Sequence, residues 1–384
     1  MPARDLYVSE RFVKAKAVAE KLSDAWFVLS ALHGLLPSDK VVENYDLGLH
    51  SLSSEQKSNW TSSVRGSMKD MFTKEDRITF LCSDAYTDDL VSKDLSKEFV
   101  IRLPLLHKSK SKQIELLLGM TGQSQSAKDL DRFYDILFQE KAVVINGSEF
   151  GTPAFATKIP SRGVYFFFEP TQKRFLRCFQ SRVVRVGTHG VSSGSKSSLL
   201  DRINTHFGTK TGGGNHRSSV MRLHIGAAML ASGTLDFSVP SWGTNNSLDG
   251  KSLDLEKRLE SEVSRFLSKM QIICISVADK SSAKSDRAYI EQNSIGLLSG
   301  KNGPIDVADS AWLGSVSPKD EIRTSSLWNV NCVHETYDPD FLDVLERYMS
   351  ITLEHVDPPA DSIAPEYWYD QRRGRESKGQ LRLF

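Results

Sequence analysis

The first 120 residues alternate between helical spacing of apolar positions and short continuous apolar runs. Four stretches have the helical spacing: 9–22, 53–71, 84–95 and 109–119. Three short runs are typical of strands: 25–31, 77–81 and 98–103. The run at 25–31 stops at His33-Gly34, as a buried parallel strand does. Strand–helix alternation of this kind predicts an α/β domain with a parallel or mixed sheet that helices flank.

The second half of the chain changes pattern after a polar stretch. Apolar content falls at 122–126, which indicates a linker, and a helix is predicted over 128–140. Residues 163–169 and 182–188 are typical of an antiparallel strand pair, joined by a third short run at 174–180. Helical spacing returns in four stretches: 197–207, 217–231, 253–269 and 285–298.

The end of the chain, 357–379, holds proline, glycine and charge with little periodicity, which predicts an extended tail. We therefore predict four parts: an α/β domain at 1–122, a linker with a helix at 123–160, a second α/β domain with a small antiparallel sheet at 161–356, and the tail at 357–384.

Composition narrows the class of protein. With 384 residues, 25% charged and 39% hydrophobic, the chain is long enough for two globular domains. The formal charge of +1 excludes a polycationic nucleic-acid coat protein but leaves room for a local basic patch. No apolar run reaches the ~18–20 residues that span a bilayer, and no signal-peptide core is present, so we expect a cytoplasmic protein without membrane contact.

The four cysteines lie far apart, without the C-x-x-C spacing of zinc or redox sites. Cys82, Cys178 and Cys274 sit among apolar residues, so we expect buried free thiols and no disulfide scaffold.

Five short motifs follow one another after Arg162. They are Gly163-Val164-Tyr165, Arg185-Val186-Gly187, Leu199-Leu200-Asp201-Arg202-Ile203-Asn204-Thr205-His206, Tyr289-Ile290-Glu291-Gln292-Asn293 and Leu327-Trp328-Asn329-Val330-Asn331. Arg202 and His206 stand four apart, so a helix places them on one face about 6 Å apart along its axis. A guanidinium can fork two phosphate oxygens there while an imidazole lies near the reacting centre, and Glu291 is a hard oxygen ligand of the kind Mg²⁺ takes.

The order and spacing of these motifs resemble the GIY-YIG endonuclease superfamily over most of residues 160–350. The resemblance implies a Mg²⁺-dependent nuclease that cuts DNA, with Tyr165 bound to the attacking water or deprotonating it, Arg202 and His206 at the phosphate, and Glu291 as the metal ligand. The second tyrosine of the family is replaced by Arg185. Arg185 could bind phosphate instead, or His189 could take over the lost role.

Each motif also has an ordinary structural interpretation. Tyr165 could simply pack within its strand, Arg202 and His206 could lie on a solvated helix face, and Glu291 could pair with Arg287 on the surface.

Two basic segments predict a nucleic-acid surface. Lys173, Arg174, Arg177, Arg182 and Arg185 lie on and between the predicted strands. The glycine-rich segment at 210–217 offers Lys210, His216 and Arg217, without Walker spacing, and could equally be a flexible connection. The DNA-binding candidates are Lys173, Arg174, Arg177, Arg182, Lys210, His216, Arg217 and Asn331.

Four motifs mark the first 120 residues: Leu6-Tyr7-Val8-Ser9, Leu29-Ser30-Ala31, His33-Gly34-Leu35-Leu36 and Tyr45-Asp46-Leu47. They resemble a bacterial domain of uncharacterised function and, distantly, the uracil-DNA-glycosylase-like domain of archaeosine synthases. Ser30, His33, Tyr45 and Asp46 are the pocket candidates: an extruded base could bind there, or Asp46 could activate a water. Alternatively, His33-Gly34 only turns the chain and Asp46 caps a loop. We favour base binding over glycosidic chemistry.

The chain ends Gln380-Leu381-Arg382-Leu383-Phe384, which is similar to the peptide by which bacterial replication and repair proteins dock on the sliding clamp. In this partner-binding peptide, which includes Leu381, the side chains of Leu383 and Phe384 would enter an apolar pocket while Gln380 bonds at its rim; alternatively, the terminal apolar residues pack back on the domain.

The sequence therefore predicts a two-domain DNA-processing enzyme with Mg²⁺-dependent endonuclease activity, by resemblance in restriction-like or antiviral defence against modified DNA. One alternative is a modified-base DNA glycosylase whose C-terminal half grips DNA. The other is a non-catalytic DNA-binding protein.

Overall fold

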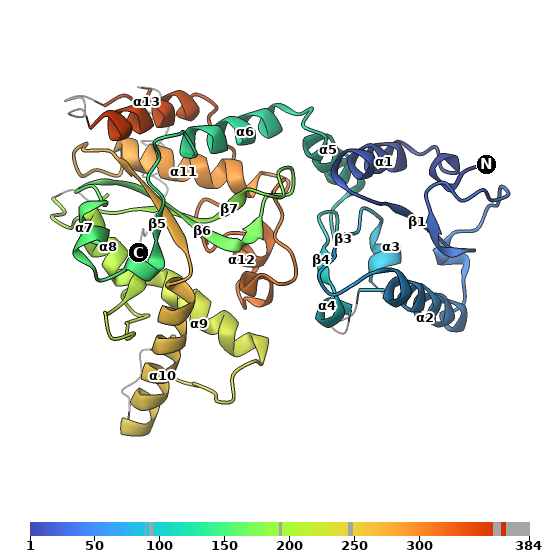
Figure 1. The fold of residues 1–384 in the computed structure, drawn as a ribbon, viewed down its shortest axis with the longest axis horizontal. Helices are drawn as coiled ribbons and strands as arrows, with labels where there is room; N and C mark the ends of the chain where they lie inside the picture. Colours follow the sequence, from blue (N-terminus) through green and yellow to red (C-terminus); the bar gives the residue numbers. More distant parts are fainter. Residues whose placement is uncertain (89, 92–94, 192–193, 245–248, 356–361, 366–384) are drawn as a thin grey trace, which may run out of the picture.

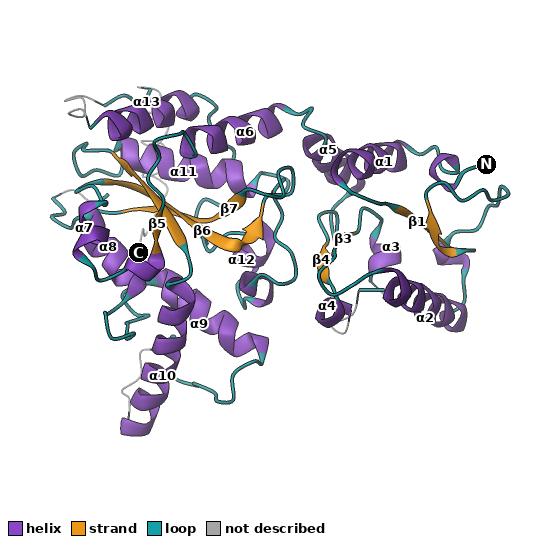
Figure 2. Cartoon of the chain, viewed as in Figure 1, coloured by secondary structure: helices purple, strands orange, loops and turns teal. Residues whose placement is uncertain are grey.

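The computed structural model describes residues 1–88, 90–91, 95–191, 194–244, 249–355 and 362–365. Its mixed α/β architecture confirms the predicted fold class. Figure 1 shows a smaller N-terminal part, in blue to teal, beside a larger C-terminal part whose sheet lies between helices. Figure 2 shows that strands occupy the middle of the C-terminal part. In the described part of the chain, no helix is both long and apolar enough to cross a bilayer.

Three longer helices frame the N-terminal part: α1 (Glu10–Leu22), α2 (Ser54–Met71) and α5 (Lys110–Met120). The Ser9 and Ser53 hydroxyls cap the first two by accepting hydrogen bonds from backbone amides of the first turn. Short helices complete it: η1 (Ala3–Asp5), η2 (Leu49–Ser51), α3 (Asp84–Thr87) and α4 (Leu95–Glu98). Residues 84–95 were predicted to form one helix. In the structure, α3 is a single turn at the start of this stretch, and α4 begins at its last residue.

Two separate two-stranded sheets replace the single predicted sheet. Strands β3 (Arg77–Thr79) and β4 (Val100–Arg102) are parallel. Strands β1 (Phe27–Ser30) and β2 (Gly34–Pro37) form an antiparallel hairpin, so the expected parallel pairing of residues 25–31 was wrong. The reason is local: Gly34, with φ of 70°, lets the chain turn back at once.

The C-terminal part is built on a four-stranded sheet in the order β5-β8-β6-β7. Its strands are β5 (Ile145–Asn146), β6 (Gly163–Lys173), β7 (Ser181–Thr188) and β8 (Gln271–Ser276), and all neighbours are antiparallel. The predicted strand at 174–180 is a loop that joins β6 to β7.

Helices cover both faces of this sheet. They are α6 (Gln125–Leu137), α7 (Pro153–Thr157), α8 (Leu199–Phe207), α9 (Val220–Ser232), α10 (Gly250–Leu267), α11 (Asp286–Ser299), α12 (Asp320–Ser325) and α13 (Phe341–Glu354), with 3-10 turns η3 (Gly147–Glu149) and η4 (Leu313–Val316). Val164 and Phe166 pack in one core with residues of α6, α11 and α13. Tyr165 and Phe167 face the opposite core, with α8, α9 and α10. Figure 1 shows α10 projecting from this part.

At two positions of the strand motifs, Gly163 and Gly187, there is no room for a side chain. A side chain at Gly163 would lie 2.0 Å from the carbonyl oxygen of Ile275 on the neighbouring strand. A side chain at Gly187 would lie 2.2 Å from the hydroxyl of Tyr165. Glycine at position 163 therefore lets β8 pair closely with β6, and glycine at position 187 leaves room for the Tyr165 ring.

The two parts of the chain share hydrogen bonds. Ile101 and Ser310 exchange two of them: the Ile101 amide donates to the Ser310 hydroxyl at 2.9 Å, and the Ser310 amide donates to the Ile101 carbonyl at 2.7 Å. Buried Arg102 donates to the carbonyl oxygen of Lys173 at 3.1 Å. These hydrogen bonds fix β4 against the C-terminal part.

Candidate active site

The two aromatic motif residues of the second half meet inside the sheet–helix layer. The Tyr165 hydroxyl, on β6, lies 2.7 Å from Nε2 of His206, on α8. Both side chains are fully buried, and their rings meet edge to face with centroids 5.5 Å apart. A solvated position for His206 is therefore wrong, whereas Tyr165 does pack in the core on its strand and also bonds His206.

The second nitrogen of His206 has its own partner. Nδ1 lies 2.8 Å from the hydroxyl of Ser219, which also caps α9 by accepting the Arg222 amide. Arg222 then donates from Nη1 to the carbonyl oxygen of His206 at 2.9 Å and pairs with buried Glu260 at 2.6 Å. The helices that follow α8 thus hold both the ring and the backbone of His206. The sequence analysis missed Ser219, because a serine 13 residues away carries no motif signal.

His206 is neutral in this setting. Burial lowers the pKa of His206 well below 6.5, and the nearby cations Arg202 and Arg185 lower it further. A neutral imidazole has one N–H and one free lone pair, so it can take up a proton. The direction of its hydrogen bonds follows from whichever nitrogen carries the hydrogen.

Two arginines lie around this pair. Arg185 on β7 pairs in register with Phe167 and is nearly buried, and it donates to the carbonyl oxygen of Trp328 at 2.6 Å. Its Nε has no hydrogen-bond partner among the residues that the structure describes. Arg202 is partly exposed on α8. Both charges lie close enough to His206 to affect its pKa, so positive charge gathers at the tyrosine–histidine pair.

The end of β7 connects this region to α11. Arg287 donates to the carbonyl oxygen of His189 at 2.8 Å and pairs with Asp279 at 2.5 Å, so it is not the surface partner of Glu291 that one interpretation required. Glu291 lies one turn further along α11 and is partly exposed. Helix α11 packs with Val164 and Phe166 on one face of the sheet, whereas Tyr165 and α8, which carries His206, pack on the opposite face, so the structure does not gather Glu291 with the tyrosine–histidine pair. Burial, and then Arg287, lower the pKa of His189 to about 4.

The asparagine that contacts the site strand is Asn329 rather than Asn331. Its amide group donates to the carbonyl oxygen of Val186 at 2.9 Å and accepts the Val186 amide at 3.1 Å. Asn329 thereby provides hydrogen-bond partners for the backbone groups on the outer edge of β7, beside Arg185. Asn331 is exposed.

Two of the basic strand residues lie in the interior, which corrects their assignment to a DNA surface. Arg174 is fully buried and pairs with Asp306 at 2.7 Å and Asp131 at 2.8 Å. Arg182 is also buried, donates to the Ser326 carbonyl oxygen at 2.5 Å and stacks on Trp312. Both faces of the sheet are covered, so a strand arginine here reaches a buried carboxylate or carbonyl instead of solvent.

The remaining basic candidates divide between interior and surface. His216 is buried, bonded to Glu260 at 3.0 Å and stacked on Trp242, so its assignment to DNA was also wrong. Lys210 and Arg217 are exposed, although Arg217 pairs with Glu256 at 2.7 Å. Lys173 and Arg177 are partly exposed.

The N-terminal pocket candidates form a hydroxyl chain. Buried Ser30 accepts hydrogen bonds at its hydroxyl from Tyr45 at 2.6 Å and from the His33 amide at 2.8 Å. The Tyr7 and Tyr45 hydroxyls are 2.5 Å apart. Asp46 is exposed beside Tyr45, and the His33 ring meets Tyr45 edge to face. Ser30, His33 and Tyr45 are thus in contact with one another.

Two further expectations concern cysteines and the tail. Cys274 is buried, but Cys178 is exposed, so its expected burial was wrong, and the four cysteines are free thiols. The clamp-like residues Gln380, Leu381, Leu383 and Phe384 lie outside the described residues. In the described part, no three histidine, cysteine or acidic side chains form a metal-binding group.

Family models match both parts of the chain. One described as a GIY-YIG domain matches residues 124–354, more than half of the chain, and one described as a family of unknown function (DUF6884) matches residues 1–118. These matches confirm the two resemblances seen in the motifs. Neither a curated protein nor a solved structure matches the chain.

Proposed function

This chain belongs to the GIY-YIG family, and we propose that it is an endonuclease that hydrolyses phosphodiester bonds of DNA. The observation that carries the proposal is the buried hydrogen bond between Tyr165 and His206, with Arg185 and Arg202 beside it. A phenol paired with a neutral imidazole and surrounded by cations suits proton transfer at a phosphate better than it suits packing.

In this mechanism Tyr165 takes a proton from the attacking water while its own proton passes to Nε2 of His206. That transfer requires the His206 tautomer whose Nδ1–H donates to Ser219, because Nε2 is then the acceptor. Tyr165 has no solvent-exposed surface, so the water reaches the phenol only after neighbouring side chains move on DNA binding.

The arginines serve the phosphate. In this proposal Arg202, which is partly exposed, forks two non-bridging oxygens, and Arg185, whose Nε has no partner among the described residues, stabilises the developing charge. In this assignment Arg185 takes over phosphate binding at the place of the family's second tyrosine. We propose His206 as the proton acceptor in preference to His189, whose Nε2 and carbonyl oxygen lie next to the Arg287 guanidinium.

The chemistry of Glu291 fits a divalent metal. Mg²⁺ commonly needs one or two carboxylates, with waters and phosphate oxygens filling the other positions, and Glu291 is a partly exposed carboxylate on α11. When bound, Mg²⁺ would neutralise charge on the phosphate and the leaving oxygen. The role of this chain's own residue is to hold the ion on α11.

Plasmid cleavage tests the proposal. We expect Mg²⁺-dependent nicking by the full chain, loss of nicking in Glu291→Ala, and a decrease of roughly 100-fold or more in Arg202→Ala. Glu140→Ala, an exposed glutamate after α6, is the matched control and should cut normally. Products that appear only after heat or alkali would instead indicate a glycosylase, and salt-sensitive binding without products would indicate a DNA-binding protein.

A setting in defence against modified DNA, and docking of the C-terminal peptide on a sliding clamp, are further proposals that rest on sequence resemblance alone.

A further inference from the structure

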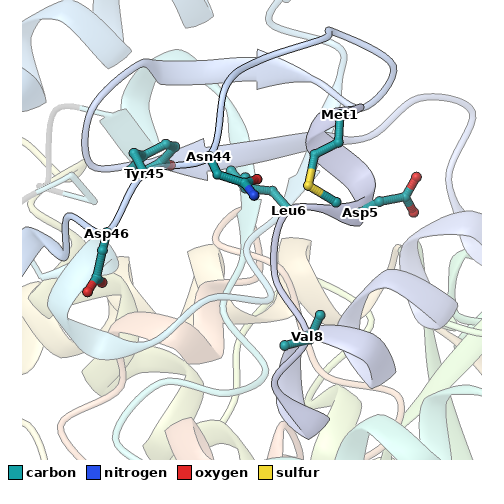
Figure 3. A pocket seen from close by; sticks show the side chains of 7 residues that line it. All are labelled: Met1, Asp5, Leu6, Val8, Asn44, Tyr45 and Asp46. Atoms are coloured by element: carbon teal, nitrogen blue, oxygen red, sulfur yellow. The ribbon is translucent and has the colours of Figure 1, made fainter.

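An open pocket of about 530 Å³ lies on the N-terminal part, far along the chain from the candidate active site. It is lined by Met1, Asp5, Leu6, Val8, Asn44, Tyr45 and Asp46. Figure 3 shows Tyr45 and Asp46 at one side, Met1 and Asp5 at the other, and Asn44 and Leu6 between them. A volume of this size is within the range of small-molecule sites.

The Tyr45 ring is held rigidly at this pocket. Its hydroxyl is bonded to Ser30, which is itself fixed by two backbone amides, and it meets the hydroxyl of Tyr7 at 2.5 Å. The His33 ring contacts it edge to face, with centroids 5.4 Å apart. Two hydrogen bonds and one ring contact therefore fix the Tyr45 side chain, and a ligand surface gains from such preorganisation.

The polar groups of the pocket select for hydrogen-bond donors. Asp46 offers carboxylate oxygens, which only accept, and Asn44 offers both a donor and an acceptor on one amide. Hydrogen bonding to Lys16 lowers the pKa of Asp5, so this carboxyl is ionised near neutral pH. Asp5 is already paired with Lys16 at 2.8 Å, so Asp46 is the carboxylate whose charge disfavours a phosphate or carboxylate ligand.

The apolar side chains of the pocket favour a flat, heterocyclic ligand. Leu6 is partly buried in the floor, while Val8 and Met1 expose apolar surface, with 88% of Val8 accessible. A heterocycle gains by covering such surface and by lying against a fixed aromatic ring.

We propose that this pocket binds a nucleobase with an exocyclic amino group, adenine or cytosine in type, turned out of the DNA strand on which the nuclease acts. Asp46 accepts the amino hydrogen, and Asn44 pairs with the adjacent ring nitrogen, as carboxylates and amides do with these bases. The inference depends on the proposed function in one respect: the base is taken to come from the DNA that the chain cuts. The recognition chemistry stands on the pocket itself.

Calorimetric titration of the full-length Glu291→Ala chain with free nucleosides tests it. Cytidine and adenosine should bind saturably, and uridine, which presents a carbonyl in place of the amino group, should bind roughly 10-fold more weakly. Asp46→Asn and Asn44→Ala should each weaken cytidine binding by a similar factor. Asp39→Asn, an exposed aspartate outside the pocket, is the control and should bind as the parent does.

Equal binding of all nucleosides, or undiminished binding in Asp46→Asn, would overturn the inference. Thermal melting of each variant identifies a loss that comes from unfolding. Plasmid cleavage by chains with intact Glu291 is measured in parallel: cleavage without nucleoside binding removes this inference alone, and nucleoside binding without cleavage removes only the proposed function.

Discussion

At the scale of single residues, Ser219 decides the state of His206. The serine lies 2.8 Å from Nδ1 in a fully buried site, so Ser219→Ala leaves that nitrogen without a partner and frees the tautomer. We expect kcat to fall roughly 10- to 100-fold, which corresponds to the ~1–3 kcal/mol cost of an unpaired buried group. Ser219→Thr should restore most of the activity, because the hydroxyl returns.

The pH profile of the same variants separates positioning from folding. Loss of the Ser219 hydroxyl should move the acidic limb of the kcat profile, whereas Ser218→Ala, an exposed neighbour, should leave both the profile and the melting temperature unchanged. A uniformly lower rate with an unmoved profile would contradict the tautomer role.

Three buried histidines make the C-terminal part sensitive to acid. Burial, assisted by Arg185, lowers the pKa of His224 to about 4, His189 has a similar value, and His206 lies well below 6.5. The unfolded chain binds protons near pH 6.5, so the free energy of unfolding should fall as pH drops from about 6.5 toward 4, by up to about 1.4 kcal/mol per pH unit for each histidine.

Guanidinium unfolding at pH 7, 6 and 5 measures this slope. His224→Gln should remove about a third of it. Equal stability at the three pH values would contradict neutral burial of the histidines.

Some residues of the site can be predicted from the sequence, and others cannot. Tyr165 and His206 meet as the order of the family motifs suggests, although the loop at 174–180 and the irregular segment after Thr188 lie between them. Arg174 and Arg182 carry the same charge as a DNA-binding residue, and only the later segment with Asp306 and the Ser326 carbonyl reveals that they are buried. Ser219 depends on the packing of α9 on α8, which no local pattern encodes.

At the scale of elements, the β6–β7 pair depends on Gly187. An alanine there would bring a methyl group within 2.2 Å of the Tyr165 hydroxyl, so the phenol must leave His206. We expect Gly187→Ala to abolish nicking and to lower stability by ~1–3 kcal/mol, as overpacking does. Gly66→Ala is the matched control: nothing lies within 4 Å of the new methyl group on α2, so this helix should gain up to about 1 kcal/mol.

The elements themselves follow the sequence where periodicity is long. The bounds of α1, α2, α5 and α11 agree with the apolar spacing to within a residue or two. The hairpin of β1 and β2 and strand β8 were missed, because four to six apolar residues suit a hairpin, a parallel strand or a buried helix equally well. Pairing with other strands decides among these three structures, and a short stretch of sequence does not contain that information.

At the scale of the whole molecule, the two parts are joined by a continuous core as well as by polar contacts. Val18 of α1 and Leu117 of α5 belong to the same apolar cluster as Tyr134 and Phe166 of the C-terminal part. Wild-type chain should therefore unfold in one calorimetric transition, because neither part can expose this cluster without the other losing its packing.

Arg102 tests that coupling. Its guanidinium is buried, bonded to the Lys173 carbonyl oxygen and 4.0 Å from Asp309, so Arg102→Ala leaves a buried carboxylate without its neighbouring cation. We expect the transition to broaden or divide, and the amide of Ser310, bonded to Ile101, to exchange hydrogen faster while amides within β6 keep their protection. Arg132→Ala, which removes an exposed pair with Asp343, should change neither. If Arg102→Ala lowers the protection of β6 and Ser310 equally, the arginine stabilises the fold as a whole and not specifically the contact between the two parts.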